Sequence, residues 1–376
     1  MSSRVRTATL CVALLLVLSS VRASGPVARS DARQGTATAA LPARLSDADF
    51  WALVADVSEP GGYFRITDNY TSNEREIGPL STMLRDADVK GGVFLGVGPE
   101  QNFSYIAAIR PAMAFVIDIR RQAVMQHLMF KAVFEMSADR AAFISTLFSK
   151  PRPSGLDAST PIQRIWEAFT PAQTDMAMAR KTYADVIQRL TKTHGFTFTA
   201  DESEQLQSVF DAFQAYGPSI TTRGSGAGGF GGNNVTFADL TGWMTDGNMQ
   251  PQSFLSTEDN YRYVKGLQDK NLVVPVSGDF GGPKTIRKIG EYLKAHHATV
   301  SGFYVSNVEQ YLFQDGKQKA FFDNVATLPV TPASIFIRAY SLRSYPSRPL
   351  CPIGRFLEAF NAGRVLTNNQ ALACAR

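Results

Sequence analysis

Two glycines and an acid are the residues of this sequence whose types and spacing best suit a chemical role. Gly96 and Gly98 close an apolar run that starts at Gly92 (GVFLGVG), and Asp118 ends the next apolar run, 20 residues after Gly98. Glycine permits a tight turn and a close backbone approach to a ligand, and the helix that follows begins with unpaired N–H groups. A carboxylate at the end of the second strand accepts hydrogen bonds from both hydroxyls of a ribose. We therefore expect Gly96, Gly98 and Asp118 to bind a nucleoside-bearing cofactor; a structural turn with a capping carboxylate is the alternative.

The residues after the glycines favour S-adenosylmethionine over a dinucleotide. The full dinucleotide pattern, GxGxxG, lacks its third glycine here, because Gly98 is followed by Pro99, Glu100 and Asn102. An acid at this point repels a pyrophosphate, whereas it suits the ammonium group of an amino acid. We expect Glu100 and Asn102 to contribute to the cofactor site, with Glu100 binding the ammonium group.

Further polar residues are expected at the same edge of the sheet. Asp279 follows the apolar run LVVPVSG, and Ser306 and Asn307 follow a predicted strand over 299–305. Ligands of open α/β sheets bind outside the carboxyl ends of the strands, so we expect contacts with substrate here. Capping of the helix predicted over 282–296 is the alternative role of Asp279. The polar segment before the first strand supplies four residues that we expect to close over the pocket, for which loop hydrogen bonding is the alternative: Asp68, Asn69, Asn73 and Glu74.

Other kinds of site find little support. The four histidines form neither an HExxH pattern nor a CxxC…H spacing, so we expect no metal. GxSxG is absent, and the glycine-rich stretch 224–232 lacks the GK[ST] ending of a phosphate-binding loop. We expect that stretch to form a lid or a connection.

Strands and helices alternate on both sides of a long helical stretch. Continuous apolar runs of five or six residues predict strands buried on both faces of a parallel sheet. The pattern predicts an α/β fold: a doubly wound, mainly parallel Rossmann-like sheet with a helical insertion. The predicted elements are strands over 92–97, 114–119, 272–278, 299–305 and 334–341, and helices over 99–110, 121–148, 282–296 and 317–325, with helical segments within 160–217.

The domain organisation follows from this pattern. We assign 45–150 to an N-terminal segment and the first half of the Rossmann-like domain, and 235–345 to its second half. Residues 151–234 form the helical insertion with its glycine-rich loop, and 346–376 form a C-terminal tail. The length of 376 residues, 44% of them hydrophobic, gives ample chain for a buried core.

The N-terminus predicts export. Residues 1–23 combine Arg4 and Arg6, a short apolar run and a small-residue cleavage pattern, as in a secretory signal peptide. Residues 24–44 are small, polar and aperiodic, so we expect a flexible linker. Removing 1–23 takes away three arginines and no acid, which lowers the net charge from +5 to +2. We therefore expect a periplasmic or secreted protein with no membrane span after cleavage. The small remaining charge favours no nucleic-acid partner, and the expected ligand is a small molecule.

The cysteines fit that compartment. Cleavage would remove Cys11 and leave Cys351 and Cys374. Two cysteines near the end of an exported chain predict one disulfide that holds the tail, with two free thiols as the alternative.

The chain also resembles an uncharacterised family with an S-adenosylmethionine-dependent methyltransferase-like, Rossmann-like fold. The resemblance covers most of residues 45–340 and is carried by LGVGPEQNFSYIAAIRPAMAFVIDIRRQ, NYTSNE, STEDNYRYVKGLQDKNLVVPVSGDFGGPKTIR and FYVSNVEQYLF. It implies a fold and a cofactor pocket, without a known activity. It also implies that Asp279 faces the methyl acceptor, although the Asn/Asp-Pro-Pro-Tyr motif of methyltransferases is absent.

Three functions remain open from the sequence. The first is methyl transfer by an exported methyltransferase-like domain, which the resemblance favours. The second is a non-catalytic exported protein that binds a nucleoside-like or small polar ligand, which the compartment favours because exported proteins do not ordinarily meet S-adenosylmethionine. The third is an exported hydrolase that uses carboxylates of Asp118, Asp279 and the segment 68–74.

Overall fold

A six-stranded, mainly parallel β-sheet lies at the centre of the computed structural model, which describes residues 40–64, 68–224, 235–338 and 348–374. The chain divides into Met1–Ala37 and Thr38–Arg376, and all described residues belong to the second unit. The predicted signal peptide, nearly all of the predicted linker and residues 225–234 of the glycine-rich loop lie outside the described residues. The strands are β1 (Val93–Val97), β2 (Met113–Asp118), β3 (Val273–Ser277), β4 (Val300–Ser306), β5 (Val330–Arg338) and β6 (Leu350–Pro352).

The strand order is β3-β2-β1-β4-β5-β6. All neighbouring strands are parallel except β5 and β6, which are antiparallel with Phe336 opposite Cys351. All residues of β2 and β3 are buried, and all residues of β1 except Val97 are buried, as their apolar sequences predicted. The chain therefore moves outward from β1 through β2 to β3, and returns to the other side of β1 for β4.

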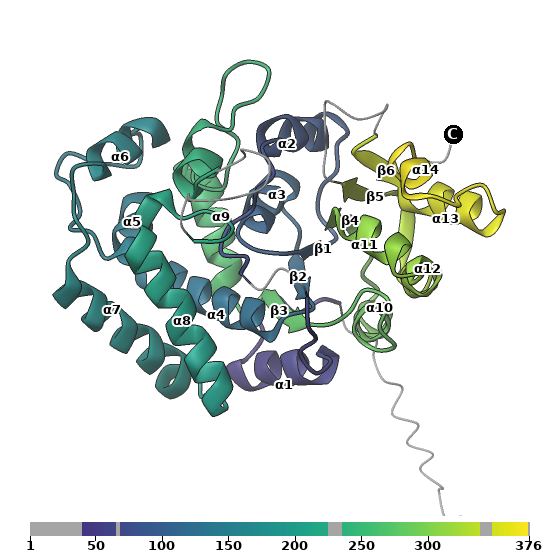
Figure 1. Ribbon diagram of the computed structural model, residues 1–376, viewed down its shortest axis with the longest axis horizontal. Helices are drawn as coiled ribbons and strands as arrows, with labels where there is room; N and C mark the ends of the chain where they lie inside the picture. The colour runs from purple at the N-terminus through teal and green to yellow at the C-terminus, as the bar shows by residue number, and fades with distance from the viewer. Residues whose placement is uncertain (1–39, 65–67, 225–234, 339–347, 375–376) are drawn as a thin grey trace, which may run out of the picture. The chain divides into compact units, whose positions relative to one another are not determined.

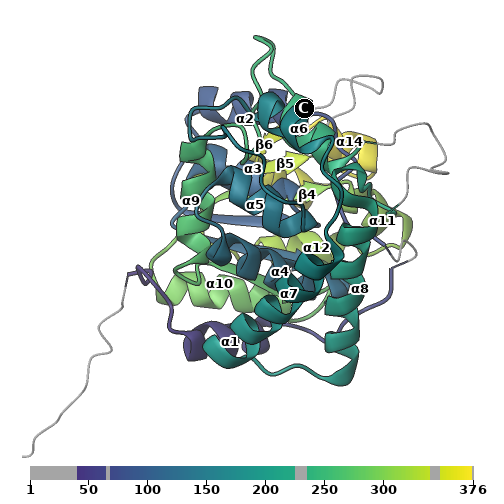
Figure 2. The same cartoon turned by 90° about the vertical axis from the view of Figure 1, so that its left-hand side faces the viewer.

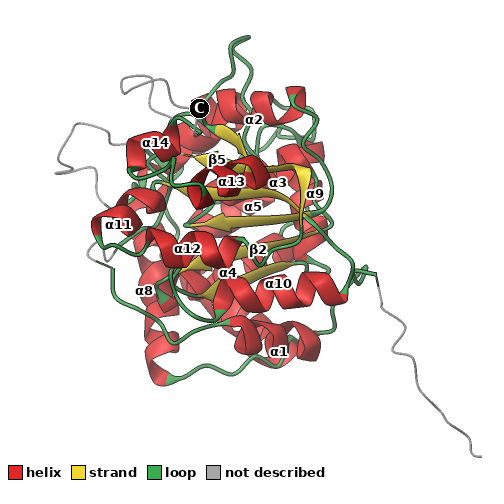
Figure 3. Cartoon of the chain, turned by 90° about the vertical axis from the view of Figure 1, so that its right-hand side faces the viewer, coloured by secondary structure: helices red, strands yellow, loops and turns green. Residues whose placement is uncertain are grey.

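Helices cover both faces of this sheet. Helices α4, α5, α7 and α8 lie in front of it in Figure 2, and α10, α12 and α13 lie in front of the strands in Figure 3. The α-helices are α1 (Asp47–Val57), α2 (Ile77–Asp86), α3 (Gln101–Ile109), α4 (Arg121–Met136), α5 (Arg140–Phe148), α6 (Ile162–Phe169), α7 (Met176–Gln188), α8 (Ala200–Tyr216), α9 (Glu258–Gln268), α10 (Thr285–Ala295), α11 (Val308–Gln314), α12 (Gln318–Val325), α13 (Ile353–Asn361) and α14 (Asn368–Leu372). Shorter turns are η1 (Arg189–Thr193, π), η2 (Gly217–Ser219, 3-10) and η3 (Asp239–Trp243, π).

The mixed α/β class and the mainly parallel sheet are confirmed, with helices α4 to α9 between β2 and β3. The helix predicted over 121–148 is two helices, because Asp139 turns its side chain onto the N–H of Ala142 and starts α5. Residues predicted as a C-terminal tail include β6, which extends the sheet. None of the described helices is long and apolar enough to cross a membrane.

The predicted disulfide between Cys351 and Cys374 is present. It joins β6 to Cys374, two residues after the end of α14, and the N–H of Arg348 donates to the carbonyl of Leu372, the last residue of that helix (2.9 Å). The end of the described chain is thereby held against the sheet edge.

Candidate functional site

A cavity of about 280 Å³ lies outside the carboxyl ends of β1, β2, β3 and β4. Because these strands are parallel, the residues that follow them meet at one edge of the sheet, and β1 and β4 mark the point where the chain reverses its direction across the sheet. The volume is just below the usual range of small-molecule sites, about 300–1,000 Å³. We call this space the carboxyl-edge cavity.

Most of the predicted site residues line the carboxyl-edge cavity. They come from the turn after β1, from the ends of β2, β3 and β4, and from the segment before α2: Gly98, Asp118, Asp279, Ser306, Asn307, Asn69, Asn73 and Glu74. Four predicted residues do not line it: Gly96, Glu100, Asn102 and Asp68. Lining residues that the sequence reasoning missed include Arg120, Tyr304, Tyr311 and Lys317.

Gly96 and Asn102 shape the turn between β1 and α3. The side-chain amide of Asn102 donates to the carbonyls of Val97 (3.0 Å), Gly98 (3.1 Å) and Pro99 (2.7 Å). A Cβ at Gly96 would lie 1.9 Å from the Oδ1 of Asn102, so only glycine leaves room for that amide. These two residues therefore hold the turn from inside.

Gly98 is the part of this turn that faces the cavity. Its φ of +81° is in the left-handed region that glycine adopts without strain. An added Cβ would meet only the Nδ2 of Asn69, at 3.7 Å. The backbone at Gly98 is therefore open to close approach by a ligand.

Glu100 is a buried group beneath the cavity wall. It is 1% exposed, and its carboxylate accepts the N–H of Ser72 at 3.2 and 3.3 Å. Burial raises the pKa of Glu100 to about 8, so the group is mostly protonated at neutral pH. Glu100 therefore does not line the cavity, where it was expected to bind an ammonium group. Its side chain instead joins α3 to the segment before α2.

Asp118 lines the cavity with both carboxylate oxygens occupied by Arg120. The guanidinium donates from Nε to Oδ1 (3.0 Å) and from Nη2 to Oδ2 (2.8 Å), and the N–H of Arg120 also donates to Oδ1 (3.0 Å). The two side chains are 6% and 13% exposed. The predicted residue is thus at the predicted place, and its partner two residues later in the chain was not foreseen.

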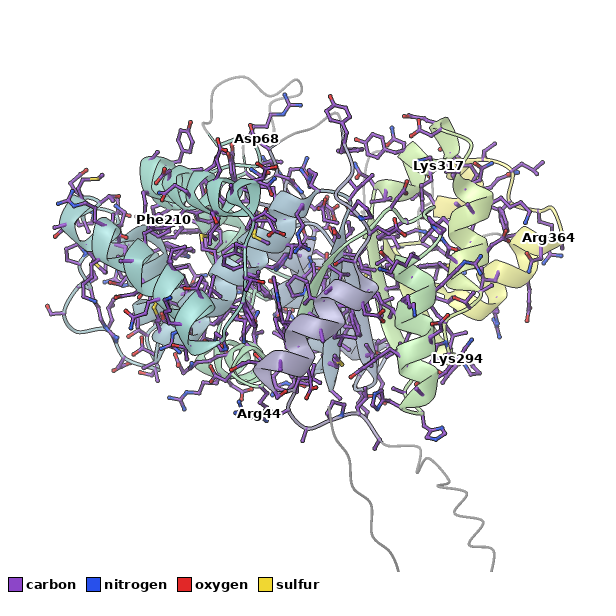
Figure 4. All side chains as sticks on the ribbon, turned by 90° about the horizontal axis from the view of Figure 1, so that it is seen from below. Arg44, Asp68, Phe210, Lys294, Lys317 and Arg364 are labelled. Carbon is purple, nitrogen blue, oxygen red and sulfur yellow. A yellow bond between two sulfur atoms is a disulfide. The ribbon has the colours of Figure 1, made fainter. Side chains whose placement is uncertain are left out.

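Asp279 is also ion-paired. Its Oδ2 accepts from the Nζ of Lys317 (2.8 Å), and its Oδ1 accepts from the N–H of Gly281 (2.9 Å). The alternative role of Asp279 as the cap of the following helix is wrong, because α10 starts at Thr285 and Glu59 accepts the N–H groups of Lys284 (2.8 Å) and Thr285 (3.0 Å). Figure 4 labels Lys317, the partner of Asp279, near the upper edge of the view, where Asp68 is labelled as well.

The described residues of the segment before α2, 58–64 and 68–74, include several that line the cavity, and hydrogen bonds hold the start of the segment. Besides its contacts with the start of α10, Glu59 accepts the N–H of Asp279 (3.2 Å), and the N–H of Gly62 donates to the carbonyl of Ile119 (2.7 Å). The expectation that this segment closes over the pocket is met at Asn69, Asn73 and Glu74. Asp68 instead accepts the hydroxyl of Tyr70 (3.3 Å).

Glu74 has surroundings unlike those of Asp118 and Asp279. Ser306 donates to its Oε1, and the Nε2 of Gln101 donates to its Oε2 at 3.3 Å. Gln101 also donates to the hydroxyl of Tyr105 (2.6 Å), whose ring packs against Tyr304 at 4.9 Å between centroids. Burial raises the pKa of Glu74, and no described cation lies within ion-pair distance of it. Burial therefore favours the protonated form of Glu74, whereas Asp118 and Asp279 are each held by a cation.

Aromatic side chains flank the mouth of the cavity. Phe64 and Tyr311 meet edge to face with centroids 5.0 Å apart, and Tyr63 beside them is 80% exposed. Such faces suit a flat or apolar part of a ligand.

A second cavity of about 330 Å³ lies among α6, α8, η2 and η3 and contains none of the predicted site residues. Trp166, Tyr216 and Trp243 are on its wall. Within the described ranges, no group of three or more His, Cys, Asp or Glu is placed to hold a metal ion.

A family model described as "Domain of unknown function (DUF7790)" matches residues 69–216 and 236–358. The matched residues include all six strands and every lining residue of the carboxyl-edge cavity except Tyr63, Phe64 and Thr222. No curated protein matches the chain.

Proposed function

The chain belongs to this family of domains of unknown function, and we propose that it is a methyltransferase-like protein that binds S-adenosylmethionine in the carboxyl-edge cavity and transfers a methyl group to a small molecule. The observation that carries the proposal is a cavity at the reversal point of the sheet that has an open glycine after β1 and an acid at the end of β2. The strand order β3-β2-β1-β4-β5-β6 is that of the Rossmann fold, here with an antiparallel last strand.

The turn after β1 suits a cofactor without a phosphate. Pro99 has no N–H to offer, and the carboxylate of Glu100 hydrogen bonds to its own N–H and to that of Ser72. The donors that bind a pyrophosphate at the start of a helix are therefore reduced in number and already partly occupied. S-adenosylmethionine requires no phosphate donors there, whereas a dinucleotide does.

The pair formed by Asp118 and Arg120 is compatible with ribose binding. A guanidinium presents two parallel N–H donors to a carboxylate, and the two neighbouring hydroxyls of a ribose present two O–H donors to the same oxygens. We propose that the ribose replaces the side chain of Arg120 on Asp118. Arg120 also lines the cavity, so its side chain stays beside the ligand after this exchange.

The strand order changes the role that we assign to Asp279. β3 lies beyond β2, on the opposite side of β1 from β4. A nucleoside held at Asp118 therefore has Asp279 on its outer side, and the reactive end of the cofactor extends toward β1 and β4. We accordingly assign Asp279 to the nucleoside end, and the acceptor to the side of Ser306 and Asn307.

When bound, the cofactor supplies an electrophilic methyl group. The residues of this chain contribute position and orientation: Gly98 lets the amino-acid part lie against the backbone, and Asp118 fixes the ribose. Holding two reactants in line lowers the barrier chiefly by removing the entropic cost of their encounter.

The other two hypotheses have less support. Of the cavity-lining carboxylates proposed for a hydrolase, Asp118 and Asp279 are paired with cations, which leaves only Glu74 of the three without an ion pair among the described residues, whereas such an enzyme uses a pair of acids. A protein that binds the cofactor or a similar nucleoside without catalysis uses the same residues, so it differs from the proposal only at the acceptor side. Export stays a prediction; the disulfide fits an oxidising compartment.

Variants at Asp118 and Arg120 test the proposal. We expect Asp118→Asn to weaken S-adenosylhomocysteine binding by roughly tenfold or more, because a hydrogen bond to a charged group contributes about 1.5–3 kcal/mol. Arg120→Leu removes the competing guanidinium, so its affinity should equal or exceed that of the wild type. Isothermal titration calorimetry measures both.

Asp259→Asn is the matched control, because it removes one carboxylate from an exposed ion pair with Arg110, outside the cavity. Unchanged affinity in Asp118→Asn, with the control also unchanged, would exclude the ribose role of Asp118.

A further inference from the structure

Glu74 differs from the two strand-end carboxylates Asp118 and Asp279, because none of the described cations forms an ion pair with it. Asp118 is neutralised by Arg120 and Asp279 by Lys317, whereas the donors to Glu74 are neutral: the hydroxyls of Ser306 and Tyr304 and the amide of Gln101. A carboxylate paired with a cation holds its charge firmly and binds polar groups. A carboxylate held by neutral donors in a half-buried site gains and loses a proton more easily.

The position of Glu74 relative to the strands places it at the reactive end of the proposed ligand. Ser306 is the last residue of β4, and Gln101 is the first residue of α3, which follows β1. Glu74 therefore lies over the β1–β4 pair, and Asp118 lies at the end of β2 on the other side of β1. A cofactor that extends from Asp118 past Gly98 directs its far end toward Glu74.

Ser306 holds Glu74 through an unusual backbone conformation. Its φ is +49°, in the left-handed region that residues with a side chain seldom adopt. Its hydroxyl donates to the carboxylate of Glu74 at the point where β4 turns into α11. Strain of this kind is retained mainly where the surrounding structure uses it, which is common at ligand sites.

We infer that Glu74 accepts the proton which a hydroxyl or amine acceptor loses when it is methylated. This inference rests on the proposed function and specifies its substrate class: a small molecule whose reacting atom is a neutral oxygen or nitrogen that carries hydrogen. The acceptor atom forms a bond to the methyl carbon, the electron pair of the carbon–sulfur bond stays on sulfur, and the proton of the acceptor passes to Glu74. The products are the methylated acceptor and S-adenosylhomocysteine, with Glu74 protonated until it releases the proton to water.

The surroundings of Glu74 suit this role. Asn307 lines the same part of the cavity and offers its amide, and the hydroxyl oxygens of Tyr304 and Ser306, whose hydrogens are donated to Glu74, can accept a hydrogen bond from the methyl acceptor. A general base works best when its pKa is near the operating pH, and burial shifts the pKa of Glu74 upward, toward that range.

Sinefungin is a probe that tests this inference without a known acceptor. In this analogue of S-adenosylmethionine a carbon bearing an amino group replaces the methylsulfonium centre, so its ammonium group occupies the place of the methyl group. If Glu74 faces that place, the wild-type protein should bind sinefungin at least tenfold more tightly than S-adenosylhomocysteine. Glu74→Gln should abolish the preference and change the affinity for S-adenosylhomocysteine less than twofold. Calorimetric titration gives all four dissociation constants.

Glu76→Gln is the control, because it removes a carboxylate two residues away that does not line the cavity; it should keep the preference. Binding of S-adenosylhomocysteine without a sinefungin preference in the wild type, or a preference that persists in Glu74→Gln, overturns the inference and leaves the proposed function standing. Absence of S-adenosylhomocysteine binding overturns both. The wild-type comparison requires no variant, so absence of the sinefungin preference overturns the inference even if Glu74→Gln fails to fold.

Discussion

Gly96 is a residue whose side-chain size determines the shape of the turn before the cavity. Its missing Cβ makes room for Asn102, which closes the turn by donating to three successive carbonyls. Gly96 and Asn102 thus depend on each other, and together they hold Gly98 where its backbone faces the cavity.

We expect Gly96→Ala to lower the free energy of unfolding by about 1–3 kcal/mol, the usual cost of overpacking. The added methyl group would displace the Asn102 amide or shift the ring of Phe94, whose Cε1 lies 2.7 Å from the Cβ position. Urea denaturation measures the change. Gly354→Ala is the control, because an added Cβ in α13 meets nothing within 4 Å. An unfolding free energy of Gly96→Ala equal to that of the wild type would contradict this account of the turn.

Which single residues line the cavity was only partly predictable from the sequence. The spacing of Gly98 and Asp118 placed both correctly, because each follows a buried strand whose apolar run is continuous. Glu100 and Asn102 point inward, and this depends on Ser72 and on Gly96, contacts that spacing along the chain does not reveal. Arg120 was missed because an arginine two residues after an acid is common on any surface.

At the scale of elements, His194 joins helices that are far apart in the sequence. Its Nδ1 contacts Asp47 in the first turn of α1 (2.7 Å), and its Nε2 contacts Glu135 in the last turn of α4 (2.7 Å). Lys131 adds an ion pair with Glu135 (2.7 Å) and a hydrogen bond to the carbonyl of Gln268 (2.6 Å). The helices between β2 and β3 are thereby linked to α1.

This cluster makes stability depend on pH. The hydrogen bond to Glu135 raises the pKa of His194, with Asp47 adding to the effect and burial opposing it. Burial alone would raise the pKa of Glu135, but the hydrogen bond from His194 and the charge of Lys131 outweigh it and lower that pKa to about 2. The stabilisation by His194 is therefore complete below its unfolded value of 6.5 and is lost as pH rises through its raised folded value. The contribution of Glu135 is present above 4.5 and is lost as pH falls toward 2.

We expect the gap in unfolding free energy between the wild type and His194→Gln to be largest from about pH 4.5 to 6.5 and to narrow above it. Denaturation curves at pH 6 and pH 9 for both proteins measure it. His297→Gln, which alters an exposed histidine after α10, is the matched control. A gap that widens between pH 6 and pH 9 would show that His194 is neutral in the folded protein.

Helices and strands were predictable from the sequence where the pattern that indicates them lies within a few consecutive residues. Apolar runs such as AFVID predicted strands within a residue or two of β1, β2 and β3. The break at Ser137–Asp139 was missed because it contains neither proline nor glycine, and β6 was missed because three residues with a proline give no strand pattern. Its place in the sheet comes from pairing with β5, which depends on contacts distant in the sequence.

At the scale of the whole molecule, the order of the strands decides how the site is arranged. Sequence order predicted a mainly parallel sheet but not which strands are neighbours, because pairing is a long-range property. The order β3-β2-β1-β4-β5-β6 separates Asp279 from Ser306 by placing β2 and β1 between their strands. In the proposed function, the nucleoside accordingly lies at one end of the cavity and the acceptor at the other.

The central claim is that this cavity binds S-adenosylmethionine, and calorimetric titration of the purified protein with S-adenosylhomocysteine tests it most directly. NAD is the parallel titrant, because the turn after β1 offers a pyrophosphate few donors. We predict one site per chain with micromolar affinity for S-adenosylhomocysteine and no detectable heat of binding with NAD. Binding of NAD alone, or of neither compound, would contradict the account.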